Sequence, residues 1–439
     1  MSRKPHVVVV GGGFTGLAAA FELSRRGVDV SLFEKEEALG GLAGSFSVEG
    51  QQIERFYHHW FTNDREILRL TADLGTSDQV LSRTTRTGMF YANSVYRMST
   101  PLDVLRFGPL PPLDRIRLGT GVLRAQRVKD WRSLEGLSAA EWLQHLFGDR
   151  VYQTVWEPLL VGKFGSRAQD VSAVWFWKKL VLRGGSRDRG GAEALAYYRG
   201  GFASLAETVA RAVTDLGGDV HIGASVDGLI VEGGRADGVV VGGSRVEADA
   251  VLITPALPIV ADLLEPFAPA DYLESLRRIE YLANVCLVLV LDRSLSGMYW
   301  LNVNDPGFPF VGVIEHTNFE PPATYAGRHI VYLSTYLSPD DELFALSADE
   351  ILAFSLPHLR RMFPAFDPAW IVGHHVWRAR YAQPVVVRNY GDMIPDVRTP
   401  IERLYLCSMA QIYPEDRGTN YAIREGRRVA GLVADDVSA

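Results

Sequence analysis

The spacing of apolar residues in the first fifty positions predicts a strand, a helix and a second strand. Val7–Val10 is an apolar run, and the glycines that follow it, Gly11, Gly13 and Gly16, have G-x-G-x-x-G spacing. An amphipathic segment comes next, and a second apolar run ends at Glu34. This order is typical of a βαβ dinucleotide-binding unit, in which the helix N-terminus faces the phosphates and the terminal acid accepts hydrogen bonds from a ribose.

Beyond that unit the apolar pattern changes twice. Residues from about 65 to 190 look mostly helical, and Ser138 and Glu141 form a capping box at the start of one helix. After Gly200 the chain shows a turn, a helix and strands punctuated by glycine. From about 265 to 395 we expect a mixed sheet with one helix between Ser347 and Met362. Its predicted strands are Ala283–Leu291, Phe310–Glu315, His329–Tyr336 and Ile371–Ala379.

Composition favours a large enzyme over a nucleic-acid binder. A chain of 439 residues with 47% hydrophobic residues is long enough for two domains, and its net charge of −7 argues against a nucleic-acid partner. Cys286 and Cys407 lie in strand-like runs and are expected to be buried and reduced, as in a cytoplasmic protein. The first strand leaves no room for a signal peptide, and no apolar run reaches the ~20 residues of a membrane-spanning helix.

A second glycine-rich turn follows the ribose-binding acid directly. Gly40–Gly44 comes soon after Glu34 and Lys35, and its backbone can lie along an extended cofactor. With this turn, the first fifty residues resemble the opening of the FAD-containing amine oxidase superfamily. That superfamily includes protoporphyrinogen oxidases, phytoene desaturases, monoamine oxidases and, more distantly, UDP-galactopyranose mutases. The segments after Gly200 and after Pro400 resemble its middle and closing segments.

The resemblance implies an α/β fold with a Rossmann-type FAD-binding domain interleaved with a substrate domain. The FAD-binding domain would comprise residues 1–64, 196–264 and 396–439. The substrate domain would have a helical part, 65–195, and a mixed-sheet part, 265–395. The residues expected to bind FAD are Gly11, Gly13, Phe14, Thr15, Gly16, Glu34, Lys35, Gly41, Leu42, Ala43, Val226, Ser408, Gly418, Thr419, Asn420 and Ile423.

One position departs from the superfamily pattern. The superfamily commonly has Ala-Gly-Asp after the last strand, and this chain has Cys407-Ser408-Met409. The cofactor contact of that Asp is therefore lost or comes from Ser408, Glu415 or Asp416. Further on, the resemblance implies that Gly418 and Thr419 begin a long helix, whose dipole would stabilise negative charge on the flavin.

The substrate side is predicted from shorter segments. His58 and His59 fall where the superfamily places a histidine near the flavin, and in an extended segment only one of them faces the ring. Arg380 and Tyr381, with Arg378, lie in a strand expected over the flavin, although arginines also serve as surface ion-pair partners. Lys163, Trp175 and Trp177 are further pocket candidates, and a tryptophan row is also typical of plain core. No metal is expected, because these histidines lack cysteine or carboxylate neighbours at ligand spacing.

The predicted activity is hydride transfer from a C–H or C–N centre to flavin N5, with a small lipophilic substrate such as an isoprenoid or tetrapyrrole. A redox-neutral isomerase or sugar mutase and a non-catalytic flavin-binding protein are the alternatives. No second G-x-G-x-x-G follows a strand, which argues against a separate NAD(P)H domain. Pro101–Val128, rich in Leu, Pro and Arg, either contacts a membrane surface or packs on the substrate domain. The oligomeric state is left open.

Overall fold

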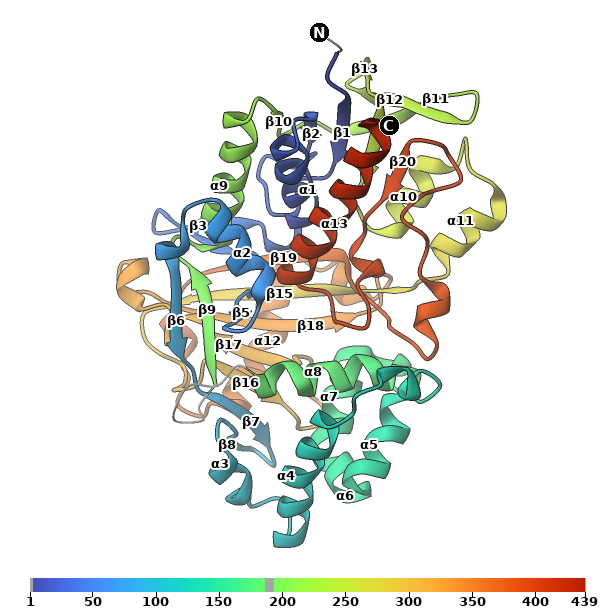
Figure 1. The fold of residues 1–439 in the computed structure, drawn as a ribbon. Helices are drawn as coiled ribbons and strands as arrows, with labels where there is room; N and C mark the ends of the chain where they lie inside the picture. Colours follow the sequence, from blue (N-terminus) through green and yellow to red (C-terminus); the bar gives the residue numbers. More distant parts are fainter. Residues whose placement is uncertain (1–2, 186–192, 439) are drawn as a thin grey trace.

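A parallel sheet at one end and a mixed sheet across the middle organise the structure (Figure 1). The computed structural model describes residues 3–185 and 193–438. The parallel sheet has the strand order β10 (Asp219–His221), β2 (Asp29–Phe33), β1 (His6–Val10), β14 (Ala250–Ile253) and β20 (Leu404–Leu406). Three distant parts of the chain therefore build one sheet, and the strands cross over as in a doubly wound fold.

Successive side chains of β1 point to opposite faces of the parallel sheet, and each face has its own hydrophobic core. Val7 and Val9 pack with the helices of one face, whereas Val8 and Val10 belong to the core on the other face. The first face carries α1 (Phe14–Arg25), α9 (Gly201–Asp215) and α13 (Thr419–Ser438). The second face carries β11 (Val226–Glu232), β12 (Arg235–Val241), β13 (Ser244–Glu247), α10 (Leu257–Leu264) and α11 (Ala270–Arg277).

The mixed sheet lies below the parallel sheet in Figure 1. Its order is β19 (Ile371–Pro384), β15 (Tyr281–Leu291), β18 (His329–Leu337), β17 (Gly312–Glu315), β16 (Trp300–Val303), β7 (Thr87–Tyr91) and β8 (Ser94–Arg97). Only the β16–β7 pair is parallel in this sheet. Every residue of β15 is buried, and α12 (Ala348–Met362) covers one face with Ile351 and Leu359.

Smaller elements connect the two sheets. The antiparallel pair β3 and β4 follows the second glycine-rich turn, and a three-stranded sheet has the order β5-β9-β6. These elements are β3 (Ser45–Val48), β4 (Gln51–Glu54), β5 (Trp60–Phe61), α2 (Arg65–Asp73), β6 (Val80–Thr84) and β9 (Ala194–Tyr198). Cys286 and Cys407 are buried and unpaired, as predicted.

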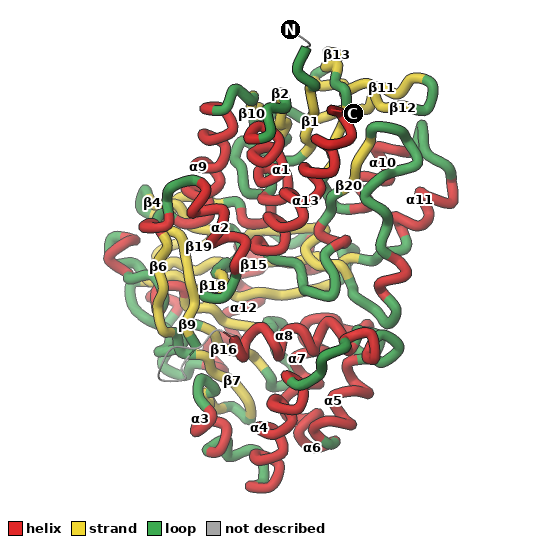
Figure 2. The backbone as a smooth tube through the Cα atoms, viewed as in Figure 1, coloured by secondary structure: helices red, strands yellow, loops and turns green. Residues whose placement is uncertain are grey.

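A group of helices lies at the end of the molecule opposite to both termini (Figure 2). It comprises α3 (Pro101–Leu105), α4 (Pro112–Gln126), α5 (Ala139–Phe147), α6 (Asp149–Val151), a π-helical turn (Tyr152–Trp156), α7 (Glu157–Phe164) and α8 (Ala173–Gly185). The predicted capping box opens α5: Glu141 N donates to Ser138 Oγ, and Ser138 N donates to Glu141 Oε2. Within the described ranges, no helix combines the length and the apolar character needed to cross a bilayer.

The predicted α/β fold class is confirmed, but the mostly helical character of residues 65–190 is wrong for one stretch. β6, β7 and β8 occupy positions 80–97. Ala92 and Asn93 both have positive φ, which makes the tight turn of a β-hairpin, and β7 buries Met89 and Phe90 in the mixed sheet. Positions 186–190 of that predicted segment lie outside the described residues. The domain boundaries proposed from the sequence stay a prediction.

We expect Gly426 to be required for the packing of α13 on α1. A Cβ at Gly426 would lie 2.3 Å from the carbonyl oxygen of Thr15, a backbone atom that cannot move alone. Gly426→Ala should lower the free energy of unfolding by about 1–3 kcal/mol, because overpacking forces the helices apart. The control is Gly431→Ala in the same helix, where the nearest atom is Arg26 Nη2 at 3.2 Å, at the end of a flexible side chain.

Gly431→Ala should be neutral or stabilising, because alanine exceeds glycine in helix propensity by up to about 1 kcal/mol. Melting temperatures of both variants measure the difference. Equal melting temperatures would contradict a close helix contact at Gly426.

Candidate functional site

The first glycine-rich turn joins β1 to α1 with almost no space for side chains. Gly11 has a φ of +105°, and a Cβ at Gly16 would lie 1.9 Å from the carbonyl oxygen of Gly11. Gly13 is the N-cap of α1 and supplies no side-chain cap, so backbone N–H groups form this helix end. A helix terminus of this kind binds anionic groups such as a pyrophosphate.

The second glycine-rich turn packs against the first. Gly40 N donates to Gly12 O at 2.9 Å, Gly13 and Gly40 form a parallel bridge, and a Cβ at Gly41 would lie 3.1 Å from Gly13 Cα. Glu34 is buried beside both turns: it accepts hydrogen bonds from Gly12 N at 2.6 Å and from Glu36 N at 2.9 Å. The structure thus brings together the predicted residues Gly11–Gly16, Glu34 and Gly41–Ala43.

Other predicted cofactor residues take different positions. Lys35 is exposed and lies 3.9 Å from Glu36. Val226 begins β11, close to Glu34, because Ala224 N donates to Glu34 O at 2.8 Å. Phe14 and Ile423 are buried in the core shared by α1, α9 and α13.

α13 packs against α1 just after the first glycine-rich turn, with Gly426 next to the backbone of Thr15. Gly418 is exposed, and Ala422 N donates to its carbonyl oxygen at 2.9 Å, so that α13 begins at Thr419 as predicted. The side chain of Asn420 caps α2 instead of facing a ligand: its Oδ1 accepts from Glu66 N at 2.9 Å and Ile67 N at 3.2 Å. Ser408 is buried at the end of β20, where its N–H donates to Gln411 Oε1.

His58 and His59 point in different directions, as expected for neighbours in an extended segment. His58 Nδ1 donates to Phe56 O at 2.6 Å, and its ring lies 5.3 Å from that of Phe202 in α9. His59 Nδ1 hydrogen-bonds Tyr299 Oη at 2.9 Å on the side of the mixed sheet. Burial lowers the pKa of His58 to about 4, so its imidazole is neutral at pH 7.

Arg378 and Arg380 do not face the site, contrary to the sequence prediction. Both are exposed and hold the loop that precedes α12. Arg378 Nε donates to Phe344 O at 2.8 Å, and Arg380 Nη2 lies 3.1 Å from Asp340 Oδ1. Tyr381 is half-buried and packs edge-on against Tyr281. The arginines therefore have a structural role on the outer face of β19.

Two of the three predicted pocket residues meet in one cluster, and the third does not. Trp177 belongs to the helical core, where its Nε1 donates to Ala125 O at 2.9 Å. Trp175 Nε1 donates to Asp416 Oδ1 at 2.7 Å, and the ammonium of Lys163 lies 4.8 Å from the centre of the Trp175 ring. Lys163 and Trp175 thus lie next to the loop that leads into α13.

Glu54, which the sequence did not single out, joins β9 and the start of α9 to the mixed sheet. Its side chain accepts hydrogen bonds from Tyr197 Oη at 2.7 Å and 2.8 Å and from Phe202 N at 2.7 Å, and its backbone oxygen accepts from Tyr332 Oη. Burial raises the pKa of Glu54 to about 7. A glutamate at the end of a strand is common, and the sequence carries no signal for these distant partners.

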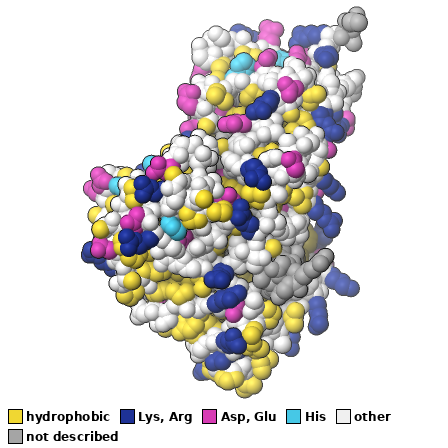
Figure 3. Space-filling model, turned by 90° about the vertical axis from the view of Figure 1, so that its left-hand side faces the viewer, with side chains coloured by type: hydrophobic (Ala, Val, Ile, Leu, Met, Phe, Trp, Pro, Cys, Tyr) yellow, Lys and Arg dark blue, Asp and Glu magenta, His cyan; other side chains and the backbone are white. Residues whose placement is uncertain are grey.

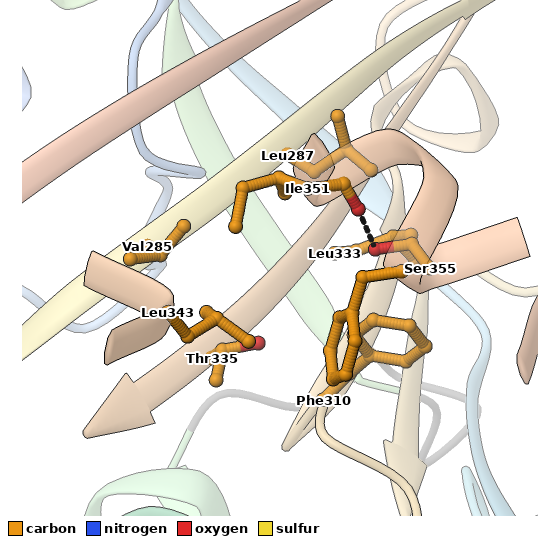
Figure 4. A pocket seen from close by; sticks show the side chains of 9 residues that line it. Val285, Leu287, Phe310, Leu333, Thr335, Leu343, Ile351 and Ser355 are labelled. Atoms are coloured by element: carbon orange, nitrogen blue, oxygen red, sulfur yellow. Dashed lines mark hydrogen bonds between the residues drawn. The ribbon is translucent and has the colours of Figure 1, made fainter. Parts of the chain in front are cut away.

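A small cavity lies away from these residues, between the mixed sheet and α12 (Figure 4). It is lined by residues such as Val285, Leu287 and Leu343, and Ser355 Oγ at its edge donates to Ile351 O at 2.7 Å. Its volume of about 10 Å³ holds at most one water molecule. It is therefore a packing defect and not a substrate site.

The parallel sheet, the paired glycine-rich turns and the buried acid at Glu34 are typical of the doubly wound α/β class of protein. Residues 14–434 match the family model described as flavin containing amine oxidoreductase, and the chain belongs to this family. It is therefore a flavin-dependent oxidoreductase.

Named relatives are distant. The chain is 23% identical over 396 residues to a coproporphyrinogen III oxidase of Bacillus subtilis, covering 82% of this chain and 83% of that protein. It is 33% identical over 161 residues to a carotenoid phi-ring synthase of Streptomyces griseus, covering 32% of this chain but only 31% of that protein. A putative protoporphyrinogen oxidase from Exiguobacterium sp. 255-15 has the same fold, with a TM-score of 0.77 and 18% identity over 99% of this chain and 100% of that one.

We expect Glu54 to make the stability depend on pH. An acid whose pKa is raised from 4.5 to about 7 on folding binds its proton more tightly in the native state. Stability contributed in this way is present below pH 4.5 and is lost as the pH rises to about 7. Glu54→Gln keeps the acceptor for Tyr197 and Phe202 but cannot ionise.

Between pH 4.5 and 8 the parent should therefore lose stability relative to Glu54→Gln, by up to about 3 kcal/mol. Urea denaturation of both proteins at several pH values measures this difference. A difference that does not change with pH would show that Glu54 ionises normally in the folded protein.

Proposed function

We propose that the flavin is FAD. The observation that carries this proposal is the packing of the two glycine-rich turns against each other beside the buried Glu34. The turns expose backbone along an extended path, as a dinucleotide requires. The carboxylate of Glu34 is positioned to accept a hydrogen bond from a ribose. The residues fit the cofactor. A Cβ at Gly418 would meet no protein atom within 4 Å, so the N-terminal end of α13 is open to a ring.

We further propose an oxidase or desaturase type of reaction on a lipophilic tetrapyrrole or isoprenoid. Bound flavin would accept a hydride at N5. The chain contributes the N-terminus of α13, whose dipole stabilises negative charge, and a lining of aromatic rings that excludes water. Tyr57 contributes to this lining, with its ring 4.9 Å from that of Trp300 and 6.2 Å from that of Tyr332. The names of the tetrapyrrole- and carotenoid-related relatives support this substrate class.

Purification under anaerobic conditions tests the reaction. We expect one FAD per chain, and bleaching of the flavin absorption by coproporphyrinogen III or by a carotenoid precursor. A colourless protein that ignores added FAD would contradict the cofactor. A yellow protein that no such compound bleaches would contradict the substrate class.

Glu34→Ala should weaken FAD binding. Its carboxylate holds Gly12 N and would accept a ribose hydroxyl, and a charge-assisted hydrogen bond contributes about 1.5–3 kcal/mol, so the dissociation constant should rise at least about tenfold. Glu36→Ala is the control, because Glu36 lies in the same turn with its side chain about half exposed. Reconstitution of the apoproteins followed by flavin fluorescence measures both. Equal affinity in the two variants would show that Glu34 does not bind the ribose.

We also propose that α3 and α4 bind an anionic membrane surface. Leu102, Leu105, Leu113, Ile116 and Leu123 are each more than half exposed, and Leu113 reaches 81%. The last three share one face of α4, opposite the buried face of that helix. Positions 101–130 carry six basic and three acidic residues, a local charge of +3 in a chain of net charge −7. Figure 3 shows hydrophobic and basic atoms together at this end.

Replacing two of these leucines should release the protein from lipid. Leu113→Asn with Leu123→Asn should reduce binding to vesicles of phosphatidylglycerol and phosphatidylcholine about thirtyfold, since each buried leucine contributes on the order of 1 kcal/mol at an interface. Leu216→Asn, an exposed leucine after α9, is the control. Vesicle co-sedimentation at low and high salt measures binding. Equal binding to purely zwitterionic vesicles, or a dimer that the double variant abolishes, would overturn the proposal.

A further inference from the structure

Three basic side chains meet around one carboxylate beside the N-terminus of α13. We call Lys163, Lys179, Arg417 and Asp416 the cationic cluster. Lys179 Nζ lies 2.7 Å from Asp416 Oδ2 and takes up the single negative charge. Burial alone would raise the pKa of Asp416, but Lys179, Lys163 and Arg417 together lower it, so the carboxylate is ionised. With Lys163 protonated, the form that a bound anion stabilises, the cluster carries two positive charges in excess.

Lys163 has no carboxylate within ion-pair distance in the described part of the chain. Its ammonium donates to the neutral amide oxygen of Gln383 at 2.9 Å. It lies 4.8 Å from the ring centre of Trp175 and 5.0 Å from that of Tyr336. Contacts with rings and an amide only partly replace a counter-charge. Burial, followed by the charge of Lys179, holds the pKa of Lys163 well below its usual range.

Arg417 is, after Lys163, the second member of the cationic cluster that has no carboxylate partner among the described ion pairs. Its Nη2 donates to Tyr336 Oη at 3.0 Å, and its Nε is buried without a hydrogen-bond partner. A buried guanidinium N–H left unbonded costs free energy unless a ligand accepts it. Tyr336 thus joins the two unpaired cations, with the Lys163 ammonium over its ring and Arg417 at its hydroxyl.

The neighbouring charges do not neutralise this excess. Glu415 is the next acid, and it is shared by Lys178 at 3.2 Å and Arg424 at 3.0 Å. Glu425 is likewise paired with Arg424 and Arg428. No further acid is paired with the cluster among the described residues.

We propose that the cationic cluster binds an anionic oxygen group of the substrate, a carboxylate or a phosphate. This inference rests on the proposed function, because it assigns the group to the molecule that the flavin oxidises. The cofactor's own phosphates have a separate place at the N-terminus of α1, between Gly11 and Gly16. The cluster instead lies on α7, α8 and the loop before α13, in contact with Tyr336 of β18 and Gln383 of β19. A substrate held here by its anionic end would lie next to the start of α13, with its apolar part among aromatic rings.

Titration of the flavin-loaded protein with simple anions tests the proposal. Inorganic phosphate and acetate, against chloride at equal ionic strength, should change the visible flavin spectrum in a saturable way. The relative affinities of phosphate and acetate distinguish the two kinds of anionic group. Lys163→Met and Arg417→Met should each raise the dissociation constant about tenfold or more, because each removes one positive charge from the site.

Two further variants separate charge from structure. Lys163→Arg keeps the charge and should stay within about threefold of the parent. Arg293→Gln removes an exposed arginine that pairs with Asp292 and should have no effect. The melting temperature of the parent protein should also rise with phosphate. This measurement needs neither the cofactor nor a variant, so it reports binding even if a substitution prevents folding.

The outcomes are distinguishable from those of the proposed function. A protein that binds FAD but shows no saturable effect of phosphate or acetate, in spectrum or melting temperature, overturns this inference alone. The same holds if Lys163→Met and Arg417→Met bind the anions as tightly as the parent. A protein without FAD whose melting temperature still rises with phosphate, and not in these variants, would retain the anion site and contradict the cofactor proposal.

Discussion

The close backbone contact between α1 and α13 is the constraint on which the site depends. Gly16 lets α1 start directly against the preceding strand, and Gly426 lets α13 cross over Thr15 without a side chain between the helices. The first and the last helix of the chain therefore meet at the glycine-rich turn. Because α13 is held in this position, the loop before it, with Asp416 and Arg417, is brought against α8 and the mixed sheet. The glycines at the contact between α1 and α13 thus fix the position of Asp416 and Arg417.

The nucleotide-binding half of the molecule is predictable from sequence because its determinants are local. Glycine spacing, a valine run and one acid specify the turn, and β1 to β2 form as the pattern indicates. The β7–β8 hairpin is harder to predict because its strands gain stability from distant partners: β7 pairs with β16, more than two hundred residues away. Its turn residues, Ala92 and Asn93, adopt positive φ in the fold, but the sequence there lacks the Asn-Gly or Asp-Gly pair that marks a two-residue hairpin.

The substrate side was less predictable, and β19 shows why. Arg380 and Gln383 are close in sequence, yet Arg380 is exposed whereas Gln383 is buried against Lys163 and Asp416. Alternation places these two residues on opposite faces, but the sequence does not show which face is buried, and the pairing of β15 with β19 also shifts register between Leu282 and Asn284. Lys163 was named from its segment, but its partners come from three other elements. Only the fold shows that two of these partners, Trp175 and Gln383, donate to the same carboxylate of Asp416.

The two proposals about the substrate are physically connected through α8. α4 carries the exposed apolar face, and its Ala125 accepts a hydrogen bond from Trp177 of α8. The same helix presents Trp175 and Lys179 to Asp416. One rigid helix thus links the surface that would contact lipid to the cluster that would hold an anionic group. An amphiphilic substrate has both an apolar body and a charged end, and burying an unpaired charge is costly unless a counter-charge receives it. A cationic site behind a helix that contacts lipid would meet both requirements, because the apolar body would leave the lipid as the charged end gained its partner.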